Sequence, residues 1–521
     1  MFSSTRLAAF LTLVALFHGS PLWGAAPFAI EIVDEETDRG VPLVELRTTS
    51  QLRFYTDSAG LVAIDDPALL DRRVHFEVRT FGYEFPADGF GIRGRALDLK
   101  PGGHATLKIK RINIAERLYR VTGEGIYRDS LLAGREAPLK QPLLNAQVVG
   151  QDSVQPVIYR DKLYFFWGDT NRQSYPLGLF AMAGATAALP SQGGLDPAVG
   201  VDLNYFTDEA GFARGMAPVA EPGAVWVEGV FTVKDDTGRE RMLGHFSRME
   251  SLAKRLERGL MLYDDEAEKF VRFKPLSLDA PLAPTGKPFQ VEHEGKSYWY
   301  FADPYPCIRV ANDWQSVQDH TAYEGFTPLR AGARYDERDP VLERNSNGEL
   351  VFDWKANTPP LTASQLRSLV DAKKIRAEES PLNLVDVARG KPVVIHGGSV
   401  YWNEFRKRWI AIFVEQRGQS YLGEVWYAEA RQPEGPWRKT VKIATHHLLA
   451  EGLGKVAVNM DFYNPTQHPF FDQQGGRIVY FEGTYTSTFS GTPTPTPRYD
   501  YNQLMYRLDL ADPRLKAVHD D

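Results

Sequence analysis

Five segments of the chain repeat one plan, and this repeat restricts the possible folds more than any other feature. Each segment contains an apolar strand, a short polar tip and a second strand rich in aromatic residues, which is the pattern of an antiparallel hairpin. The spacing of roughly 60 to 110 residues holds one four-stranded blade plus loops. The repeat therefore predicts a five-bladed β-propeller. The segments are PVIYRDKLYFFWGDT from 156, VWVEGVFTVKDDTGRERMLGHF from 225, PFQVEHEGKSYWYFADP from 288, GGSVYWNEFRKRWIAIFVE from 397 and HPFFDQQGGRIVYFEGTY from 468.

The chain before the repeat predicts a separate small domain. Residues 27 to about 111 contain short alternating runs separated by turns, which is typical of a β-sandwich. The pieces VDEETDRGVPLVEL and FYTDSAGLVAI resemble the transthyretin-like or carboxypeptidase-regulatory modules of exported bacterial proteins. This resemblance implies a spacer or adhesion unit. The predicted fold class is thus all-β, with a β-sandwich at 26–111 followed by a propeller at 112–521.

Two interruptions of the propeller pattern predict helices. RMESLAKRLERGL from 248 has the composition of a short helix, and TASQLRSLVDAKKIRAEE from 362 places apolar residues at helical spacing. Thr362 and Ser364 are the candidate caps of the second helix. Both helices are expected to be insertions between blades.

Residues 1–25 have the pattern of a secretory signal peptide. Arg6 precedes an eleven-residue apolar run from Leu7 to Phe17, with small residues around an expected cleavage site near Ala25. Such a run is too short to cross a bilayer. We therefore expect export to the periplasm or outside the cell. Cys307 is the single cysteine, so no intramolecular disulfide is possible, and a buried structural thiol is expected.

The charge balance argues against polyanionic partners. The chain carries 60 basic and 67 acidic residues, for a formal net charge of -7, so no general attraction to nucleic acid is expected. No segment after the signal peptide is long and apolar enough to span a membrane. The aromatic content of 12% suits a β-rich fold and also the stacking of aromatic rings on sugar rings.

The first hairpin is bracketed by two aspartates. Asp152 and Asp169 average to position 160.5, inside the polar tip at 160–162. Residues equidistant from a hairpin tip face each other across the ladder. The two carboxylates are therefore expected to lie close together at one end of the ladder, where like charges repel. The alternative is that both are turn-forming strand caps.

Pairing residues that are equidistant from the other hairpin tips also places acidic and imidazole groups at the ends of the ladders. The equivalent ends of the inner hairpins share one face of a propeller, so their acidic and imidazole groups are expected to converge at one mouth. Asp303 ends the third hairpin without a clear partner. The expected pairs are Glu228 with His245, His396 with Glu415, and Glu482 with Gln467 beside His468.

Converging carboxylates suit the cleavage of a glycosidic bond. One carboxylic acid protonates the leaving oxygen, and a second carboxylate acts as nucleophile or as base for water. Neighbouring like charges separate the two pKa values, so that one group stays protonated while the other is ionised. Asp152 and Asp169 are the candidate catalytic pair, and Glu228 is the candidate supporting acid. Asp303 and Glu482 are rivals for that third place.

Two motifs connect the chain to known propellers. In the first blade, Asp152 precedes an apolar strand, a basic turn, an aromatic strand and Gly168-Asp169-Thr170, and residues 425–437 read VWYAEARQPEGPW. With these motifs, the chain from about 140 to 515 resembles the five-bladed propeller glycosidases of glycoside hydrolase families 32, 43 and 117 and the endo-D-arabinanase propellers. The resemblance implies that the paired aspartates are catalytic. Blade two departs from it, with WVEGVF in place of Arg-Asp-Pro, and blade three has ADPYPC without the acid of family 32.

Other polar and aromatic residues near the predicted mouth are candidates for binding sugar hydroxyls or stacking on a ring, with a structural role as the alternative for each. They are Trp167, Trp226, His396, Asn464, His468 and Glu482. The pair His446-His447 lacks further ligands at suitable spacing, so no zinc site is assigned. No cofactor is expected, and a structural calcium ion is compatible with an oxygen-rich rim.

The sequence hypothesis is an exported glycoside hydrolase that acts on a poly- or oligosaccharide. Two other hypotheses stay open, because a fold does not determine a function. One is a non-catalytic propeller that binds carbohydrate or protein. The other is a polysaccharide lyase that uses His396 and Tyr401. The sugar, its linkage, exo or endo action, the stereochemical outcome and the oligomeric state are not specified by these patterns.

Overall fold

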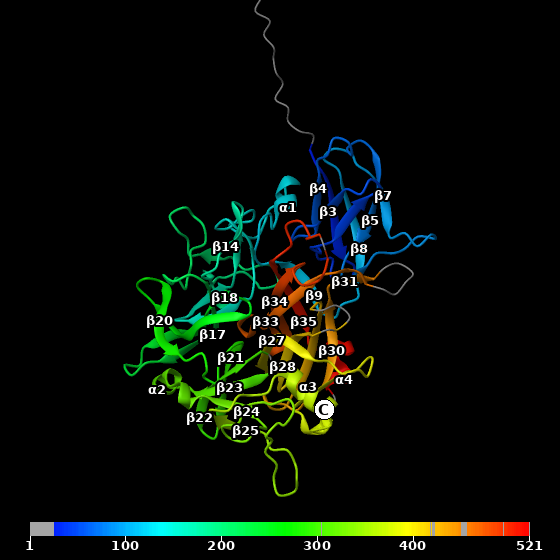
Figure 1. The fold of residues 1–521 in the computed structure, drawn as a ribbon. Helices are drawn as coiled ribbons and strands as arrows, with labels where there is room; N and C mark the ends of the chain where they lie inside the picture. Colours follow the sequence, from blue (N-terminus) through cyan, green and yellow to red (C-terminus); the bar gives the residue numbers. More distant parts are fainter. Residues whose placement is uncertain are drawn as a thin grey trace, which may run out of the picture.

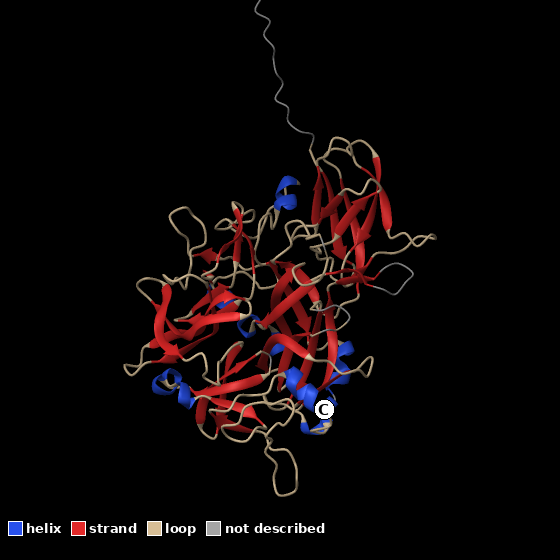
Figure 2. Ribbon diagram, viewed as in Figure 1, coloured by secondary structure: helices blue, strands red, loops and turns tan. Residues whose placement is uncertain are grey.

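The computed structural model describes residues 26–303, 305–416, 418, 422–449, 456–492 and 494–519. The predicted signal peptide, residues 1–25, lies outside these residues. Strands are the main secondary structure of the described chain, and the helices are short and peripheral (Figure 2). None of the described helices has the length and apolar character that a membrane crossing needs.

Two four-stranded sheets form the N-terminal sandwich, drawn in blue in Figure 1. Their strand orders are β4-β1-β8-β6 and β3-β2-β5-β7. β1 pairs with β8 in parallel, and the other pairs are antiparallel. Ile30, Phe76 and Leu107 belong to the apolar core of this sandwich. The strands are β1 (Phe28–Asp34), β2 (Glu45–Thr48), β3 (Arg53–Tyr55), β4 (Leu61–Ile64), β5 (Arg73–Arg79), β6 (Tyr83–Glu84), β7 (Gly94–Asp98) and β8 (His104–Arg111).

The rest of the chain forms five sheets arranged as blades, so the predicted all-β, five-bladed propeller preceded by a sandwich is confirmed. Blade one is β11 (Gln155–Tyr159), β12 (Lys162–Trp167), β15 (Ala183–Ala187) and β16 (Asn204–Tyr205). Blade two is β17 (Ala224–Lys234), β18 (Glu240–Ser251), β19 (Lys254–Asp264) and β20 (Lys269–Leu276). Blade three is β21 (Lys287–His293), β22 (Lys296–Ala302), β23 (Pro306–Ala311), β24 (Glu324–Thr327) and β25 (Asp353–Ala356).

Blades four and five complete the ring. Blade four is β27 (Ile395–Asn403), β28 (Arg408–Glu415), β29 (Glu424–Ala430), β30 (Trp437–Thr445) and β26 (Leu382–Asp386). Blade five is β33 (Asp461–Gln467), β34 (Ile478–Thr486), β35 (Asn502–Asp509) and β9 (Glu116–Arg120). β9 precedes blade one in the chain and pairs antiparallel with β35, so it joins the start of the propeller to its end. The ion pair between Arg507 and Glu116 links the same two strands.

Smaller elements connect the blades. β10 (Val148–Gln151), β13 (Thr170–Arg172) and β14 (Tyr175–Leu179) form a small sheet beside blade one, and β31 (His447–Leu449) pairs with β32 (Val456–Asn459). The helices are α1 (Arg128–Leu132), α2 (Trp314–Gln318), α3 (Ala363–Asp371) and α4 (Lys516–His519), and the 3-10 turns are η1 (Pro190–Gln192), η2 (His320–Ala322), η3 (Ala377–Glu379), η4 (Pro469–Phe471), η5 (Gln474–Gly476) and η6 (Pro513–Leu515).

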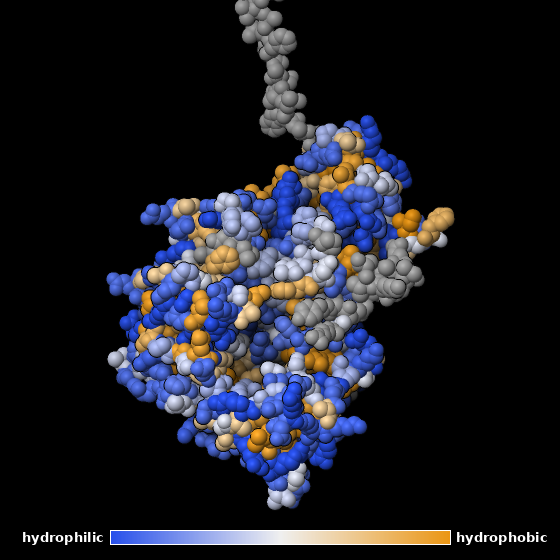
Figure 3. All heavy atoms as spheres, viewed as in Figure 1, coloured by the Kyte–Doolittle hydropathy of each residue, from blue (hydrophilic) through white to orange (hydrophobic). Residues whose placement is uncertain are grey.

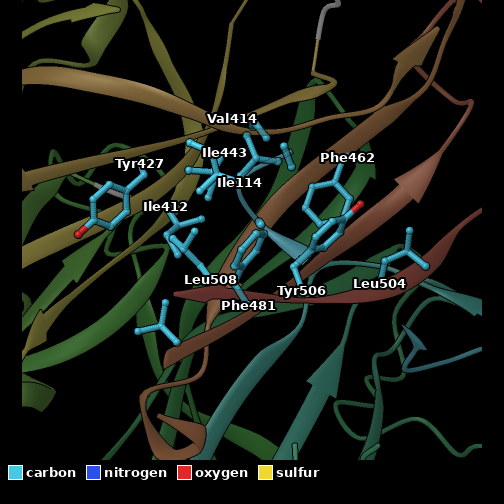
Figure 4. Close-up of a cluster of buried hydrophobic side chains, with 14 of the residues drawn as sticks. Ile114, Ile412, Val414, Tyr427, Ile443, Phe462, Phe481, Leu504, Tyr506 and Leu508 are labelled. Atoms are coloured by element: carbon cyan, nitrogen blue, oxygen red, sulfur yellow. The ribbon is translucent and has the colours of Figure 1, made fainter. Parts of the chain in front are cut away.

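The aromatic strands are buried because each blade packs against a neighbour on both faces. Successive side chains of a strand point to opposite faces, so Phe165 of β12 packs toward blade five while Phe166 packs toward blade two. Equivalent apolar clusters join blades two and three, three and four, and four and five. Figure 4 shows the last of these, where Ile412 of β28 lies near Phe481 and Tyr506. Hydrophilic side chains dominate the surface seen in Figure 3.

The hairpin tips follow from local turn chemistry. Arg160 and Asp161 have φ values of 49° and 61°, as the two central residues of a type I′ hairpin turn require. Tyr159 therefore pairs with Lys162, and the ladder is centred between 160 and 161. The predicted register of the first hairpin is confirmed.

Two predictions about the other segments need correction. The helix expected from 248 is wrong, because β18 and β19 continue through it with Leu252 at their turn; pairing with the neighbouring strands overrides local helix propensity there. The fifth hairpin begins earlier than predicted, since β33 starts at Asp461 and the segment after His468 forms η4. The predicted helix from 362 is present as α3, with Thr362 in a capping box.

Candidate functional site

A cavity of about 610 Å³ lies where the inner strands of several blades end. A cavity of this size with a few polar groups among apolar walls is the usual form of a small-molecule site. Blades one, two, four and five all contribute side chains to it. Those used below are Asp152, Asp169, Trp226, Glu228, Leu252, His396, Tyr463, Asn464, Phe489, Asp500 and Tyr501.

Asp152 and Asp169 lie opposite each other across the open end of the first hairpin. The pairs Gln155 with Phe166 and Gln151 with Thr170 flank them in two successive ladders. The N–H of Gly168 donates to the Asp152 carbonyl oxygen over 2.8 Å. Both carboxylates line the cavity, so the predicted juxtaposition is present in the structure.

The Asp152 carboxylate lies in a network of donors. The Tyr463 hydroxyl donates to its Oδ2 over 2.9 Å, and the Tyr501 hydroxyl and the backbone N–H of Asp169 also hydrogen bond to it. These donors favour the ionised form, whereas burial and the nearby Asp169 charge disfavour it. The unfavourable effects are larger and raise the pKa of Asp152 to about 6.

Asp169 is held from the neighbouring blade. The indole Nε1–H of Trp226, on β17, donates to Asp169 Oδ1 over 3.1 Å. Burial raises the pKa of Asp169, and the indole bond partly opposes this effect. The predicted substrate-binding residue Trp226 therefore lines the cavity and also positions an acid.

Glu228 faces the same cavity from β17. It pairs with His245 across the ladder, as the hairpin register predicts. The walls around Glu228 raise its pKa, Lys287 opposes this shift, and Asp303 adds to it. The side chain is nevertheless accessible to water, and this accessible surface opens into the cavity. The pKa of Glu228 is therefore raised by the confined cavity around it and not by complete burial of the side chain.

Asp303 has a partner that the sequence did not reveal. Its Oδ1 accepts a hydrogen bond from the N–H of Gly398 in blade four over 2.8 Å. His396, two residues earlier, lines the cavity. The surrounding protein lowers the pKa of His396, and the Asp303 charge opposes this shift. Ile395, and not His396, stands opposite Glu415, because the ladder is irregular between Ile395 and Gly398.

Asn464 lines the cavity as predicted and donates to the Ser153 hydroxyl over 2.8 Å. The other three candidate binding residues are fully buried and do not line it. Trp167 stacks on Phe165 with ring centroids 5.7 Å apart. His468 Nε2 lies 3.6 Å from Glu482 Oε1 inside blade five.

Glu482 stands opposite Thr466 and not Gln467, because an irregularity in the ladder shifts the register. Its rival role as third acid is therefore not supported by its position. Tyr401, the second residue of the lyase hypothesis, packs against Phe289 between blades with ring centroids 6.3 Å apart and is not among the cavity residues.

Several cavity residues escaped the sequence analysis. Tyr463, Tyr501, Phe489 and Leu252 all line it. Tyr463 directly precedes the candidate Asn464, and this is the one local signal that pointed toward it. Cys307 is partly accessible, and burial of its thiol raises its pKa to about 12, which suits an inert structural cysteine. Over the described part of the chain, no group of three or more His, Cys, Asp or Glu side chains is arranged to hold a metal ion.

No protein-family model matches the chain, and no curated protein matches it in sequence. Among solved structures, a GH43_1 enzyme from Xanthomonas citri complexed with xylotriose is 12% identical with a TM-score of 0.33, over 70% of this chain and 88% of that one. Exo-beta-1,3-galactanase from Phanerochaete chrysosporium with galactose is 11% identical with a TM-score of 0.34, over 76% and 65% of the two chains.

A third similar structure is a putative exo-beta-1,3-galactanase from Bifidobacterium bifidum s17. It is 10% identical with a TM-score of 0.31, and the match covers 83% of this chain and 94% of that one. These values are too low to transfer a function, so the functional conclusion depends on the cavity itself.

Proposed function

We propose that this protein is an exported glycoside hydrolase that cleaves a glycosidic bond in a poly- or oligosaccharide. The observation that carries the proposal is the convergence of Asp152, Asp169 and Glu228 on one cavity of about 610 Å³. The pKa of each of the three carboxyl groups is raised above its ordinary value. Glycosidic cleavage requires one carboxyl group that keeps its proton until it reaches the leaving oxygen, and a raised pKa favours that form.

In the proposed reaction, Asp152 and Asp169 share the chemistry as a coupled pair. One of them, protonated, donates its proton to the leaving glycosidic oxygen. The other, ionised, attacks the anomeric carbon or removes a proton from the attacking water. Because the two charges interact, the pair titrates as a unit. Glu228 supports the pair from the neighbouring blade by binding a substrate hydroxyl.

The walls of the cavity suit a sugar ring. Trp226 and Phe489 offer aromatic surface, and Asn464 and His396 offer hydrogen-bonding groups. Aromatic rings that stack on the apolar face of a ring, combined with a few polar groups, are the usual means of orienting a small polar ligand. The substrate class we propose is therefore a carbohydrate.

We also propose that residues 1–25 direct export and are removed. The basic residue, the short apolar run and the small residues before Ala26 support a cleaved signal peptide. The mature enzyme would then act on glycans in the periplasm or outside the cell.

The test is the release of new reducing ends from a panel of plant, algal and bacterial glycans. Asp152→Asn and Asp169→Asn are expected to lower the rate by about three orders of magnitude while the thermal unfolding curve shows a folded protein. Asp161→Asn is the matched control, because Asp161 lies at the exposed tip of the same hairpin with φ 61°, which asparagine tolerates. The control is expected to keep the wild-type rate.

Three results would overturn the proposal. Wild-type rates in both catalytic variants would make the two aspartates strand caps. Binding of a glycan without any new reducing end would identify a binding protein. An unsaturated product that absorbs in the ultraviolet would identify a lyase.

A further inference from the structure

A second cavity lies between the sandwich and the propeller. It has a volume of about 290 Å³ and shares no lining residue with the central cavity. The sandwich contributes β3 and the residues that follow it, and the propeller contributes β9, α1 and residues 497–499. The lining residues that matter here are Arg53, Tyr55, Arg120, Arg128, Arg498 and Tyr499. We call this cavity the junction cleft.

Arginines outnumber carboxylates among the lining residues of the junction cleft. Four arginines line it, against the three carboxylates of Asp57, Asp65 and Asp129. Asp129 is shared by two of the arginines, with Arg128 Nη1 at 3.3 Å and Arg498 Nη1 at 3.6 Å. Arg53 is also paired with Glu45 beyond the lining, with Nε 3.8 Å from Oε1, so the positive charge available to an anionic occupant comes from Arg120, Arg128 and Arg498.

Asp57 is already satisfied by protein donors. The backbone N–H and the hydroxyl of Ser130 donate to its Oδ2 over 2.7 and 2.8 Å. The N–H groups of Ala59 and Leu61 donate to its Oδ1. Burial raises the pKa of Asp57 despite these bonds. The Asp57 carboxylate therefore has no free acceptor for the arginines of the cleft.

Arg120 at the base of the cleft lacks part of its bonding. It is 1% exposed, and its guanidinium lies 4.4 Å from the centre of the Tyr499 ring. One of its amino groups donates to the Arg498 carbonyl oxygen, but its Nε has no hydrogen-bond partner among the described residues. Arg120 therefore places a buried, incompletely paired positive charge at the base of the cleft.

Arg498 is held over the cleft in a costly backbone conformation. Its φ is 64°, in the left-handed region that long side chains seldom adopt. The absence of a side chain at Gly125 makes room for it, since a β-carbon there would come within 3.3 Å of Arg498 Cδ. Such strain persists where the surroundings hold a side chain in place.

We propose that the junction cleft binds an acidic sugar, that is, a sugar ring that carries a carboxylate or sulfate group. The accessible, planar guanidinium groups of Arg128 and Arg498 are suited to paired hydrogen bonds with such an oxyanion. Phe54 and Tyr55, both half-buried, supply aromatic surface for the ring. This site does not depend on the reaction proposed for the central cavity.

One short segment of the chain lines both cavities. Pro497, Arg498 and Tyr499 line the junction cleft, and the next two residues, Asp500 and Tyr501, line the central cavity. Occupation of the cleft is therefore expected to restrain the segment that carries Tyr501.

The test is calorimetric titration of the mature full chain with glucuronic acid, glucose 6-sulfate, glucose and inorganic sulfate at constant ionic strength. Both acidic sugars are expected to bind, glucose is not, and inorganic sulfate is expected to bind at least tenfold more weakly. Arg498→Gly removes the guanidinium and suits the positive φ, and Arg128→Gln keeps polarity without charge. Each is expected to weaken acidic-sugar binding by about tenfold.

Two control variants separate the junction cleft from other sites. Arg73→Gln removes an exposed arginine elsewhere on the sandwich, which pairs with Asp98, and is expected to change nothing. Asp169→Asn alters the central cavity and is expected to leave acidic-sugar binding intact. Loss of binding in Asp169→Asn would place the sugar in the central cavity and overturn the proposal.

Other outcomes would also overturn the proposal. No binding of either acidic sugar would do so, as would equal affinity in Arg498→Gly, Arg128→Gln and the wild type. Inorganic sulfate that binds as tightly as the acidic sugars would show a site for a free anion and not for a sugar.

Discussion

The N–H of Gly168 donates to the carbonyl oxygen of Asp152 over 2.8 Å, and this bond holds the two ends of the first hairpin together. It also brings the backbone of Gly168 against the Asp152 side chain. A β-carbon at position 168 would lie 2.2 Å from Asp152 Oδ1, closer than any nonbonded contact permits.

Gly168→Ala is therefore expected to displace the Asp152 carboxylate while leaving the fold intact. Catalytic groups need placement within a fraction of an ångström, so kcat is expected to fall by about two orders of magnitude. Steady-state kinetics on the glycan identified in the panel would measure this. Gly89→Ala, at an exposed turn of the sandwich with open space around it and no positive φ, is the control for the general effect of such a change. An unchanged kcat in Gly168→Ala would contradict the expectation.

Tyr463→Phe is expected to move the acid limb of the pH–rate profile to higher pH. The Tyr463 hydroxyl stabilises ionised Asp152, whose pKa is about 6. Removal of this donor disfavours ionisation and raises the pKa, by about one pH unit if the bond is typical of those to charged groups. The measurement is kcat/KM as a function of pH from about 4 to about 9, a range that contains the acid limb before and after the expected shift. A limb that stays in place would show that Asp152 does not control it.

Trp226→Phe is expected to keep the aromatic wall and lose the hydrogen bond to Asp169. The indole bond lowers the pKa of Asp169, so its loss raises that pKa and frees the carboxylate to rotate. We expect kcat/KM to fall by about tenfold. Trp402→Phe is the matched control, because its indole donates to Glu404 over 2.7 Å far from the cavity. Equal losses in both variants would point to a general structural effect.

Glu415→Gln is expected to stabilise the protein at alkaline pH. Burial and the neighbouring Glu424 raise the pKa of Glu415 to about 7, and Arg389 and Lys442 only partly oppose this. The folded state therefore holds the proton more tightly than the unfolded state, whose value is 4.5. The contribution of Glu415 to stability is most favourable below the unfolded pKa and is lost progressively as pH rises toward 7.

The gain in the free energy of unfolding of Glu415→Gln over the wild type is thus expected to grow between pH 4.5 and pH 7, to at most about 3 kcal/mol. Urea unfolding at a series of pH values measures it. Glu404→Gln, at the exposed tip of the same hairpin, is the control and is expected to show no such gain. A gain that does not change with pH would exclude titration of Glu415 as the cause.

The structure also shows where sequence patterns mislead. Trp167 ends an aromatic strand next to the catalytic candidates, yet strand alternation turns it into the cluster between blades five and one. His468 and Glu482 were placed by reflection about a tip, but the connection between β33 and β34 contains two 3-10 turns. Reflection is reliable only across a short regular turn.

The sequence by itself determined most of the strands, the number of blades and the facing positions of Asp152 and Asp169. These depend on alternation along a strand and on turn residues, which act within a few residues. Tertiary structure alone decided which other groups reach the acids. Tyr463 reaches Asp152 across a separation of 311 positions, and Gly398 reaches Asp303 across 95. Such contacts form only when apolar burial between blades closes the ring, and no local pattern encodes them.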